Sequence, residues 1–460
     1  MNGSPKTKVL ASFRDPSGFI FKKEGEYFRQ VNQTYKENYD LLIKSGLFDE
    51  LVKLGLLVNH QEVVSSKIDA SIYKILKPTQ IPFISYPYEW SFSQLKDAAL
   101  LTLEIQNIAL KFGMSLKDAS AYNIQFLRGK PILIDTLSFE KYENGRPWVA
   151  YRQFCQHFLA PLALASHTDL RLGLLSQTHL DGIPLDLAAK ILPGKTRFSL
   201  GLSTHIFLHA KSQISHADGT QETAGLKLPK NQLIGIVDNL KAAVLGLKLP
   251  RQRTTWDNYY GNTNYSEAGF KNKEKIISDW IKKVKPKTLW DAGANDGHFS
   301  RLSSGQKIRT LSTDFDPIAV ENNYLKMKSD NDQCLFPLII DLVNPSPSIG
   351  WQNEERNSFT ERNYSDLTLC LALVHHLAIS NNLPLGYIAE FFNRQTKFLI
   401  IEFVPKDDSN AQKLLANRKN IFASYDQKSF EKEFSVYFKI IEQAKIKDSN
   451  RTLYLMERSN

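Results

Sequence analysis

Cysteine is scarce in this sequence, and the positions of the few cysteines exclude a disulfide framework. The 460 residues include only Cys155, Cys334 and Cys370. Their number is odd, they lie far apart, and two of them lie in apolar, strand-like runs. This pattern favours reduced, buried thiols and predicts a cytoplasmic protein. The sequence has no Cys-x-x-Cys pair and no Cys/His cluster, so we expect no metal site.

Long apolar runs are also absent. No run of about 18 apolar residues is uninterrupted, so we expect no membrane span. The first residues, MNGSPKTKVLASFRDPSG, lack the apolar core of a signal peptide. Basic residues exceed acidic ones by 58 to 48, but they are spread along the chain. No basic run resembles a nucleic-acid stripe or a polybasic membrane patch, so we expect no nucleic-acid partner.

The composition is that of an ordinary globular protein, with 42% hydrophobic and 23% charged residues. A length of 460 residues predicts two or three domains. We place a linker near Pro250, between a first domain over residues 1–248 and a second over residues 256–460.

The stretch that reads LWDAGANDGHFS, residues 289–300, is the most informative of the C-terminal half. A short apolar strand ends at Asp291, a tight loop with Gly293 and Gly297 follows, and we expect a helix to begin at about His298. Glycine lets a backbone pass close to a ligand, and a helix start offers unbonded N–H groups. The pattern therefore predicts a site for a nucleotide-like ligand, with an ordinary strand-to-helix turn as the alternative.

The spacing of this loop is not that of the dinucleotide fingerprint, which needs glycine at the positions of Asn295 and His298. The pattern Asp-x-Gly-x-Asn-x-Gly resembles the first motif of class I S-adenosylmethionine-dependent methyltransferases, with Asn295 where most members have glycine. Asparagine tolerates positive φ better than other non-glycine residues, so we expect the loop to close.

Four more predicted strands follow, at residues 308–313, 335–340, 366–371 and 398–403, and two final β runs at 437–444 and 452–457. Polar residues stand at the carboxyl ends of these strands: Asp314, Asp341, the pair His375-His376, and Glu402. Strands that alternate with helices and then close with a hairpin predict an α/β fold. The resemblance implies a Rossmann-like class I methyltransferase domain with a seven-stranded, mostly parallel sheet.

The resemblance also implies roles for these residues. S-adenosyl-L-methionine would be the cofactor, held by Asp291, Gly293, Asn295, Gly297, Asp314 and Asp341. Asp314, preferred over Asp316, would accept hydrogen bonds from the ribose, and Asp341 would face the adenine. Trp351 would lie over the adenine or in the core. Trp256, Tyr260 and Tyr265 would cover the methionine end or simply pack.

Residues 18–31 predict a hairpin, 33–57 a helix, 63–77 and 81–86 strands, and 91–112 a long amphipathic helix. In the segment LKDASAYNIQFLRGKPILIDTLSFE, residues 116–140, Asp118 precedes Asn123 by five, and Asp135 follows a short hairpin. This resembles the catalytic loop of kinase-like and aminoglycoside-phosphotransferase-like folds. By that resemblance Asp118 is a base, and Asn123 and Asp135 are metal ligands.

The kinase pattern is incomplete in this α+β domain. The triplet at Asp135 is Asp-Thr-Leu, and the sequence has neither a glycine-rich phosphate loop nor a Val-Ala-x-Lys strand. A degenerate kinase-like domain that binds substrate or partner is therefore favoured over an active kinase. Asp118 as a turn cap and Asp135 as a strand end is the structural alternative.

Several further segments, among them LALVHHLAISNNLPL and IEFVPKDD, look like a bacterial methyltransferase-like family that includes the nodulation protein NoeA. The resemblance implies an S-adenosylmethionine-dependent methyltransferase whose acceptor, a small molecule, glycan or protein, the sequence does not identify. We expect His376, or alternatively His375, as a base, and Glu402 to orient the substrate. The alternatives are a phosphotransferase fused to a methyltransferase domain, and a non-catalytic binding protein of two degenerate domains.

Overall fold

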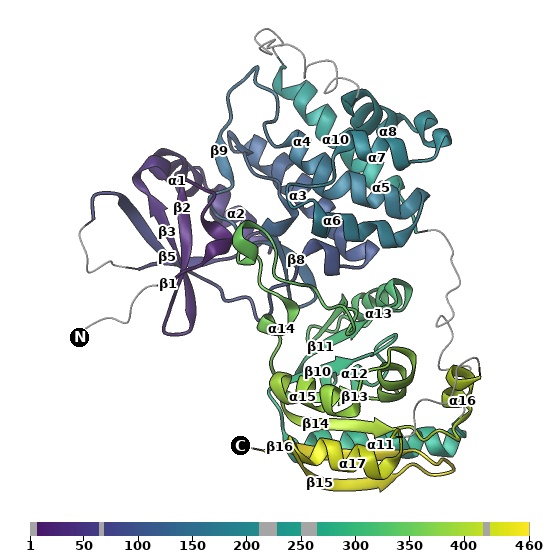
Figure 1. The fold of residues 1–460 in the computed structure, drawn as a ribbon. Coiled ribbons are helices and arrows are strands. Elements are labelled where there is room, and N and C mark those ends of the chain that lie inside the picture. The colour runs from purple at the N-terminus through teal and green to yellow at the C-terminus, as the bar shows by residue number, and fades with distance from the viewer. Residues whose placement is uncertain (1–6, 64–68, 211–227, 250–264, 417–423, 460) are drawn as a thin grey trace. The chain divides into compact units, whose positions relative to one another are not determined.

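The chain forms two compact units in a computed structural model that describes residues 7–63, 69–210, 228–249, 265–416 and 424–459 (Figure 1). The first unit contains Met1–Arg251 and also Ser348–Asn357. The second contains Gln252–Pro347 and Ser358–Asn460. Ten residues from the middle of the second unit's sequence therefore belong to the first unit, which no pattern in the sequence indicated.

The first unit begins with a five-stranded sheet in the order β1-β2-β3-β5-β4. Every neighbouring pair in it is antiparallel. The strands are β1 Thr7–Lys8, β2 Gly18–Lys23, β3 Glu26–Asn32, β4 His60–Val63 and β5 Ile72–Pro78. The predicted hairpin at 18–31 is β2 and β3, and Gly25 in its turn has φ 84°.

Two expectations in this region were wrong. The helix expected at 33–57 is broken at Gly46, where φ is 82°, into α1 Lys36–Lys44 and α2 Leu47–Lys53. The strand expected at 81–86 is irregular. Pro82 and Pro87 have no N–H to donate to a ladder. The backbone N–H and C=O of Ser85 bond instead to the side-chain amide of Gln125.

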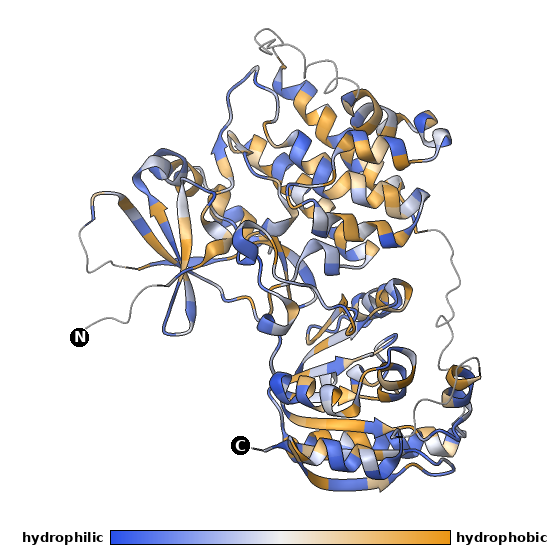
Figure 2. Cartoon of the chain, in the orientation of Figure 1, coloured by the Kyte–Doolittle hydropathy of each residue, from blue (hydrophilic) through white to orange (hydrophobic). Residues whose placement is uncertain are grey.

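The helical part of the first unit starts with α3 Phe92–Lys111, where the sequence predicted it. The Ser91 side chain accepts from the Gln94 N–H, and Gln94 bonds back to the Ser91 N–H, which forms a capping box. Figure 2 shows hydrophobic and hydrophilic sides on the helices of this unit. The later elements are β6 Met114–Leu116, β7 Ile124–Leu127, β8 Lys130–Leu133, β9 Phe139–Lys141, α4 Tyr151–Phe154, α5 Ala160–His167, α6 Leu175–Thr178, α7 Leu185–Ile191, α8 Leu200–Leu202 and α10 Lys230–Gly246.

The second unit is built on a seven-stranded sheet in the order β12-β11-β10-β13-β14-β16-β15. The first five strands are parallel, and β16 pairs antiparallel with both of its neighbours. This is the mixed α/β sheet that the sequence predicted. The strands are β10 Thr288–Ala292, β11 Arg309–Asp314, β12 Leu335–Ile339, β13 Ser365–Cys370, β14 Thr396–Phe403, β15 Phe438–Lys445 and β16 Thr452–Arg458.

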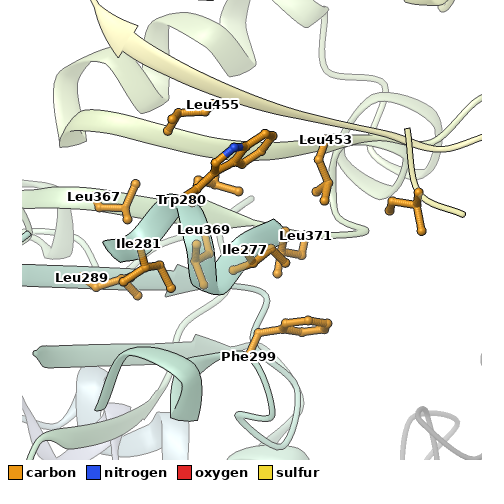
Figure 3. Close-up of a cluster of buried hydrophobic side chains, with 12 residues drawn as sticks. Ile277, Trp280, Ile281, Leu289, Phe299, Leu367, Leu369, Leu371, Leu453 and Leu455 are labelled. Carbon is orange, nitrogen blue, oxygen red and sulfur yellow. The ribbon is translucent and has the colours of Figure 1, made fainter. Parts of the chain in front are cut away.

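Helices flank this sheet and bury its faces. They are α11 Glu267–Val284, α12 Ser300–Ser304, α13 Pro317–Ser329, α14 Phe359–Arg362, α15 Leu385–Gln395, α16 Ser409–Leu415 and α17 Gln427–Ser435. Figure 3 shows side chains of α11, among them Ile277, Trp280 and Ile281, in one cluster with leucines of β10, β13 and β16. In the part of the chain that is described, no helix is long and apolar enough to cross a membrane.

Candidate functional site

The loop after β10 turns by positive backbone angles at three residues. The φ angle is 73° at Gly293, 51° at Asn295 and 79° at Gly297. Asn295 thus adopts the left-handed conformation expected of it. A Cβ at Gly297 would lie 2.4 Å from the side-chain amide of Asn323, so only glycine fits there without displacement. The helix α12 begins at Ser300, two residues later than expected.

Asp314, at the end of β11, is hydrogen-bonded to this loop. Its Oδ2 accepts from the Asn295 N–H at 2.8 Å, and its Oδ1 accepts from the Asp316 N–H at 2.9 Å. Asp316, the position not chosen for the ribose, instead caps α13 by accepting from the N–H of Ile318. Burial raises the pKa of Asp314 to about 6.

Asp291 lies at the carboxyl end of β10 and is only 1% exposed. The hydroxyl of Ser300 donates to its Oδ2 at 2.6 Å. Burial raises the pKa of Asp291 to about 7, although the Ser300 hydrogen bond opposes the shift. A nearby positive charge would therefore be favourable, because it would offset the cost of ionising two buried carboxylates close together.

These groups line one cavity of about 450 Å³ at the carboxyl ends of the parallel strands. The predicted residues that line it are Asp291, Gly293, Asn295, Asp314, Asp341 and His376. Asp341 is exposed at its rim and accepts from the Val343 N–H at 2.9 Å. The predicted residues that do not line it are Gly297, which shapes the loop from behind, and His375 and Glu402.

The two adjacent histidines are in different positions. His376 lines the cavity, whereas His375 is 1% exposed and its Nδ1 has no hydrogen-bond partner among the described residues. Burial lowers the pKa of His376 to about 4 and that of His375 to about 3. Both imidazoles are therefore neutral near pH 7, and only His376 can meet a molecule in the cavity.

Glu402 is fully buried in an ion cluster. Its Oε2 lies 2.6 Å from Lys273 Nζ, its Oε1 lies 3.4 Å from Arg451 Nη1, and the Tyr265 hydroxyl donates to it. Burial alone would raise the pKa of Glu402, but the charges of Lys273 and Arg451 outweigh it and hold the pKa at about 2. The expectation that Glu402 orients a substrate does not fit this position, because both carboxylate oxygens are already bonded to neighbouring side chains.

Lys273 and Tyr265, two members of this cluster, also line the cavity, and no sequence pattern had singled out Lys273. A signal was present, because Lys273 stands between Phe270 and Ile277 on the apolar stripe of α11. Tyr265, which we expected either near the methionine end or in packing, lies at the cavity wall. Trp256 and Tyr260 lie outside the described residues. Trp351 is 66% exposed, so the expectation that it lies in the core is wrong, and its place over the adenine stays a prediction.

Comparison with known proteins gives one relative over almost the whole chain. The nodulation protein NoeA of Rhizobium meliloti (strain 1021) is 34% identical over 462 residues, which cover 98% of this chain and 96% of that protein. The chain belongs to the NoeA family. No protein-family model matches the sequence.

Solved structures resemble this NoeA-family chain weakly. The N-methyltransferase NodS from Bradyrhizobium japonicum WM9 is 8% identical, with a TM-score of 0.32, over 42% of this chain and 99% of that one. The bifunctional kinase-methyltransferase WbdD is 13% identical, with a TM-score of 0.30, over 42% of this chain and 40% of that one. TM-scores this low support no inference about the NoeA-family chain.

The N-terminal unit of the NoeA-family chain has a second cavity, of about 650 Å³, and Asp118, Asn123 and Asp135 all line it. Arg29 Nη1 lies 2.5 Å from Asp135 Oδ1, and the Ser138 hydroxyl donates to Asp135 Oδ2 at 2.5 Å. A cation and a hydroxyl therefore already hold the carboxylate of this expected metal ligand. Among the described residues, no group of three or more His, Cys, Asp or Glu is placed to hold a metal ion.

Proposed function

We propose that the chain is an S-adenosyl-L-methionine-dependent methyltransferase, with the cofactor in the cavity of the second unit. The observation that carries the proposal is the bond from the Asn295 N–H to Asp314, which joins the glycine loop after β10 to the acidic end of β11. Ligands of open α/β sheets bind outside the carboxyl ends of the parallel strands, where this bond lies.

The residues of the cavity fit this cofactor. A volume of about 450 Å³ lies within the range of small-molecule sites. Asp314 would accept from the ribose hydroxyls, and Asp341 would face the adenine amino group. The pKa of about 7 leaves Asp291 about half ionised near pH 7 when no cofactor is bound. Asp291 would pair with the positively charged methionine end of the cofactor.

The cofactor would supply a methyl group on a positively charged sulfur, activated for in-line displacement. The chain would align the acceptor and keep water away, and apolar residues such as Phe299 and Leu373 line the cavity. His376 would take the proton from a hydroxyl or amine acceptor, since it is the neutral imidazole in the cavity wall. His375 would support the ring of His376, with 4.2 Å between the two ring centroids.

We also propose a kinase-like fold without phosphotransfer for the first unit. An antiparallel sheet precedes the long helix α3, and the loop with Asp118, the β7–β8 hairpin and Asp135 then follow. This order supports the fold, while the Arg29–Asp135 pair argues against a metal at Asp135. The acceptor of the methyl group would be a small molecule, glycan or protein.

Calorimetric titration tests the cofactor assignment. Wild type should bind S-adenosyl-L-methionine with a Kd of roughly micromolar. Asp314→Asn should weaken binding at least about tenfold, since Asn has one acceptor oxygen fewer and no charge. Asp366→Asn is the matched control, because Asp366 accepts from the N–H groups of Lys287 and Thr288 and does not line the cavity. Equal affinities of wild type and Asp314→Asn, or no binding by wild type, would refute the assignment.

A further inference from the structure

The segment Ser348–Asn357 forms part of the wall of the cavity in the N-terminal unit. Its Glu355 is 3% exposed and accepts two hydrogen bonds from Arg14, Nε to Oε1 and Nη2 to Oε2, both 2.9 Å. The guanidinium of Arg356 lies over the ring of Tyr122, 4.5 Å from its centroid. The Asn357 N–H donates to Tyr86 at 3.0 Å. A bidentate pair and a stacked cation hold this segment in the wall.

The charges in this cavity are largely paired with one another. Four cationic side chains that line it have a carboxylate within 4 Å: Arg14 with Glu355 at 2.9 Å, Arg29 with Asp135 at 2.5 Å, Lys117 with Asp15 at 3.8 Å and Arg356 with Glu355 at 3.7 Å. A phosphate group would have to compete with these carboxylates, and a divalent cation would have to compete with Arg29. The wall therefore favours a ligand without net charge.

Three polar groups in the wall retain unused hydrogen-bonding capacity. Tyr122 Oη and Arg356 Nε are buried and have no hydrogen-bond partner among the described residues. The Asp118 carboxylate accepts from neutral donors, namely the Ser120 N–H at 2.9 Å, the Gln153 amide at 2.8 Å and the Asn123 side chain. Buried polar groups without partners are costly, so a ligand that bonds to them is stabilised. Together they offer a donor, a hydroxyl that can donate or accept, and a carboxylate acceptor.

We propose that this cavity binds a neutral ligand rich in hydroxyl groups, of the saccharide class. Each hydroxyl of such a ligand both donates and accepts, which matches the mixture of groups at Asp118, Tyr122 and Arg356. A saccharide also brings no charge that would break the existing ion pairs. This site is separate from the cofactor cavity of the proposed function, so either assignment can fail while the other holds.

Calorimetry on the full chain tests the proposal, with neutral mono- to tetrasaccharides of glucose, mannose, galactose and N-acetylglucosamine as probes. At least one of these saccharides should bind with a Kd of about 10 mM or lower. Asp118→Asn should weaken its binding about tenfold, the loss of one hydrogen bond to a charged group. Tyr122→Phe should weaken binding severalfold and yet leave the melting temperature unchanged or higher, because the lost hydroxyl has no protein partner.

Matched controls are Asp186→Asn and Tyr142→Phe, whose side chains lie outside the cavity and bond to Lys190 and Asn144. Both controls should leave saccharide affinity unchanged. Inorganic phosphate and Mg·ATP are titrated in parallel. The proposal is overturned if no saccharide binds, if Asp118→Asn and Tyr122→Phe both bind as wild type does, or if only phosphate or Mg·ATP binds.

Discussion

Lys273 Nζ lies 2.6 Å from Glu402 Oε2, and both side chains are almost fully buried, at 3% and 0% exposure. The pair joins helix α11 to strand β14 at the cavity of the second unit, which Lys273 lines. Arg451 extends the cluster, since its guanidinium bonds to Asp408 through Nε at 2.7 Å and Nη2 at 3.0 Å. Charges buried this deeply are tolerated only when each one has partners.

Lys273→Met should therefore destabilise the second unit markedly. Removal of one partner leaves excess negative charge buried at Glu402, which costs about 3 kcal/mol of unfolding free energy. Lys271→Met is the matched control on the same helix, because Lys271 pairs with Glu267 at the surface, where screening by water leaves the pair little effect on stability. Urea denaturation of both variants measures the difference, and equal losses would contradict the role of the buried pair.

Gly297→Ala should destabilise the loop after β10. The added Cβ meets the Asn323 amide at 2.4 Å, and that amide is held by Ser312 and Arg301, so it cannot turn away freely. With the positive φ of 79° as well, we expect a loss of about 1–3 kcal/mol.

Gly235→Ala is the contrasting control. Gly235 lies inside α10 with open space around it, and alanine there should stabilise by about 0.5–1 kcal/mol. Thermal melting of the two variants should therefore shift in opposite directions. If Gly297→Ala melts as wild type does, the loop is not constrained as described.

Asp291→Asn should stabilise the ligand-free protein, and more so at high pH. The pKa of Asp291 is about 7 in the folded state against 3.8 as its ordinary value, so the folded state holds a proton that the unfolded state releases. The free energy of unfolding therefore falls as the pH rises from about 4 to 7, and this loss is complete above pH 7. Asn has no such penalty, which predicts a gain on the order of 2–4 kcal/mol at pH 8.

Unfolding midpoints of wild type and Asp291→Asn at pH 5 and pH 8 provide the measurement. The advantage of the variant should be larger at pH 8. A constant difference, or one that shrinks with rising pH, would show that the folded state does not raise the pKa of Asp291. The same variant should bind S-adenosyl-L-methionine more weakly, so stability and cofactor affinity should change in opposite directions.

The ionisation of His375 should make stability depend on pH in the opposite direction to that of Asp291. Its pKa is about 3 in the folded state against 6.5 as the ordinary value, so the unfolded state takes up the proton first. The stability that this neutral ring allows is present above pH 6.5 and is lost as pH falls. When the pH is lowered from 6.5 to about 4.5, the unfolding free energy should fall less in His375→Leu than in wild type. The difference should reach up to about 2 kcal/mol. Parallel acid dependences in denaturation experiments would refute this.

The sequence predicted those features of the second unit that depend on local pattern. The end of β11 at Asp314 follows from the order of elements, and the structure contains it, whereas β12 ends at Ile339, two residues before Asp341. The position of Glu402 could not be predicted, because its partners Lys273 and Arg451 are 129 and 49 residues away in the chain. Adjacent His375 and His376 could not be separated either, because only tertiary packing buries one and leaves the other at the cavity.

In the first unit Asp118, Asn123 and Asp135, which the sequence pattern grouped, line one cavity, and their roles there stay predictions. It missed Arg29, whose pairing with Asp135 links a strand of the first sheet to a loop more than 100 residues later. It also missed Glu355 and Arg356, because no local signal marks a segment that leaves one unit to join the other.

Hydrogen–deuterium exchange of the full chain, with and without S-adenosylhomocysteine, tests the central claim most directly. The product shares the adenosine and amino-acid parts of the cofactor, so it should protect residues 291–297, 314–316 and 340–343, which form or adjoin the cavity wall. Asp314→Asn should reduce this protection, whereas Asp366→Asn should not. Protection confined to the first unit near Asp118, or no protection at all, would contradict the assignment of the cofactor cavity.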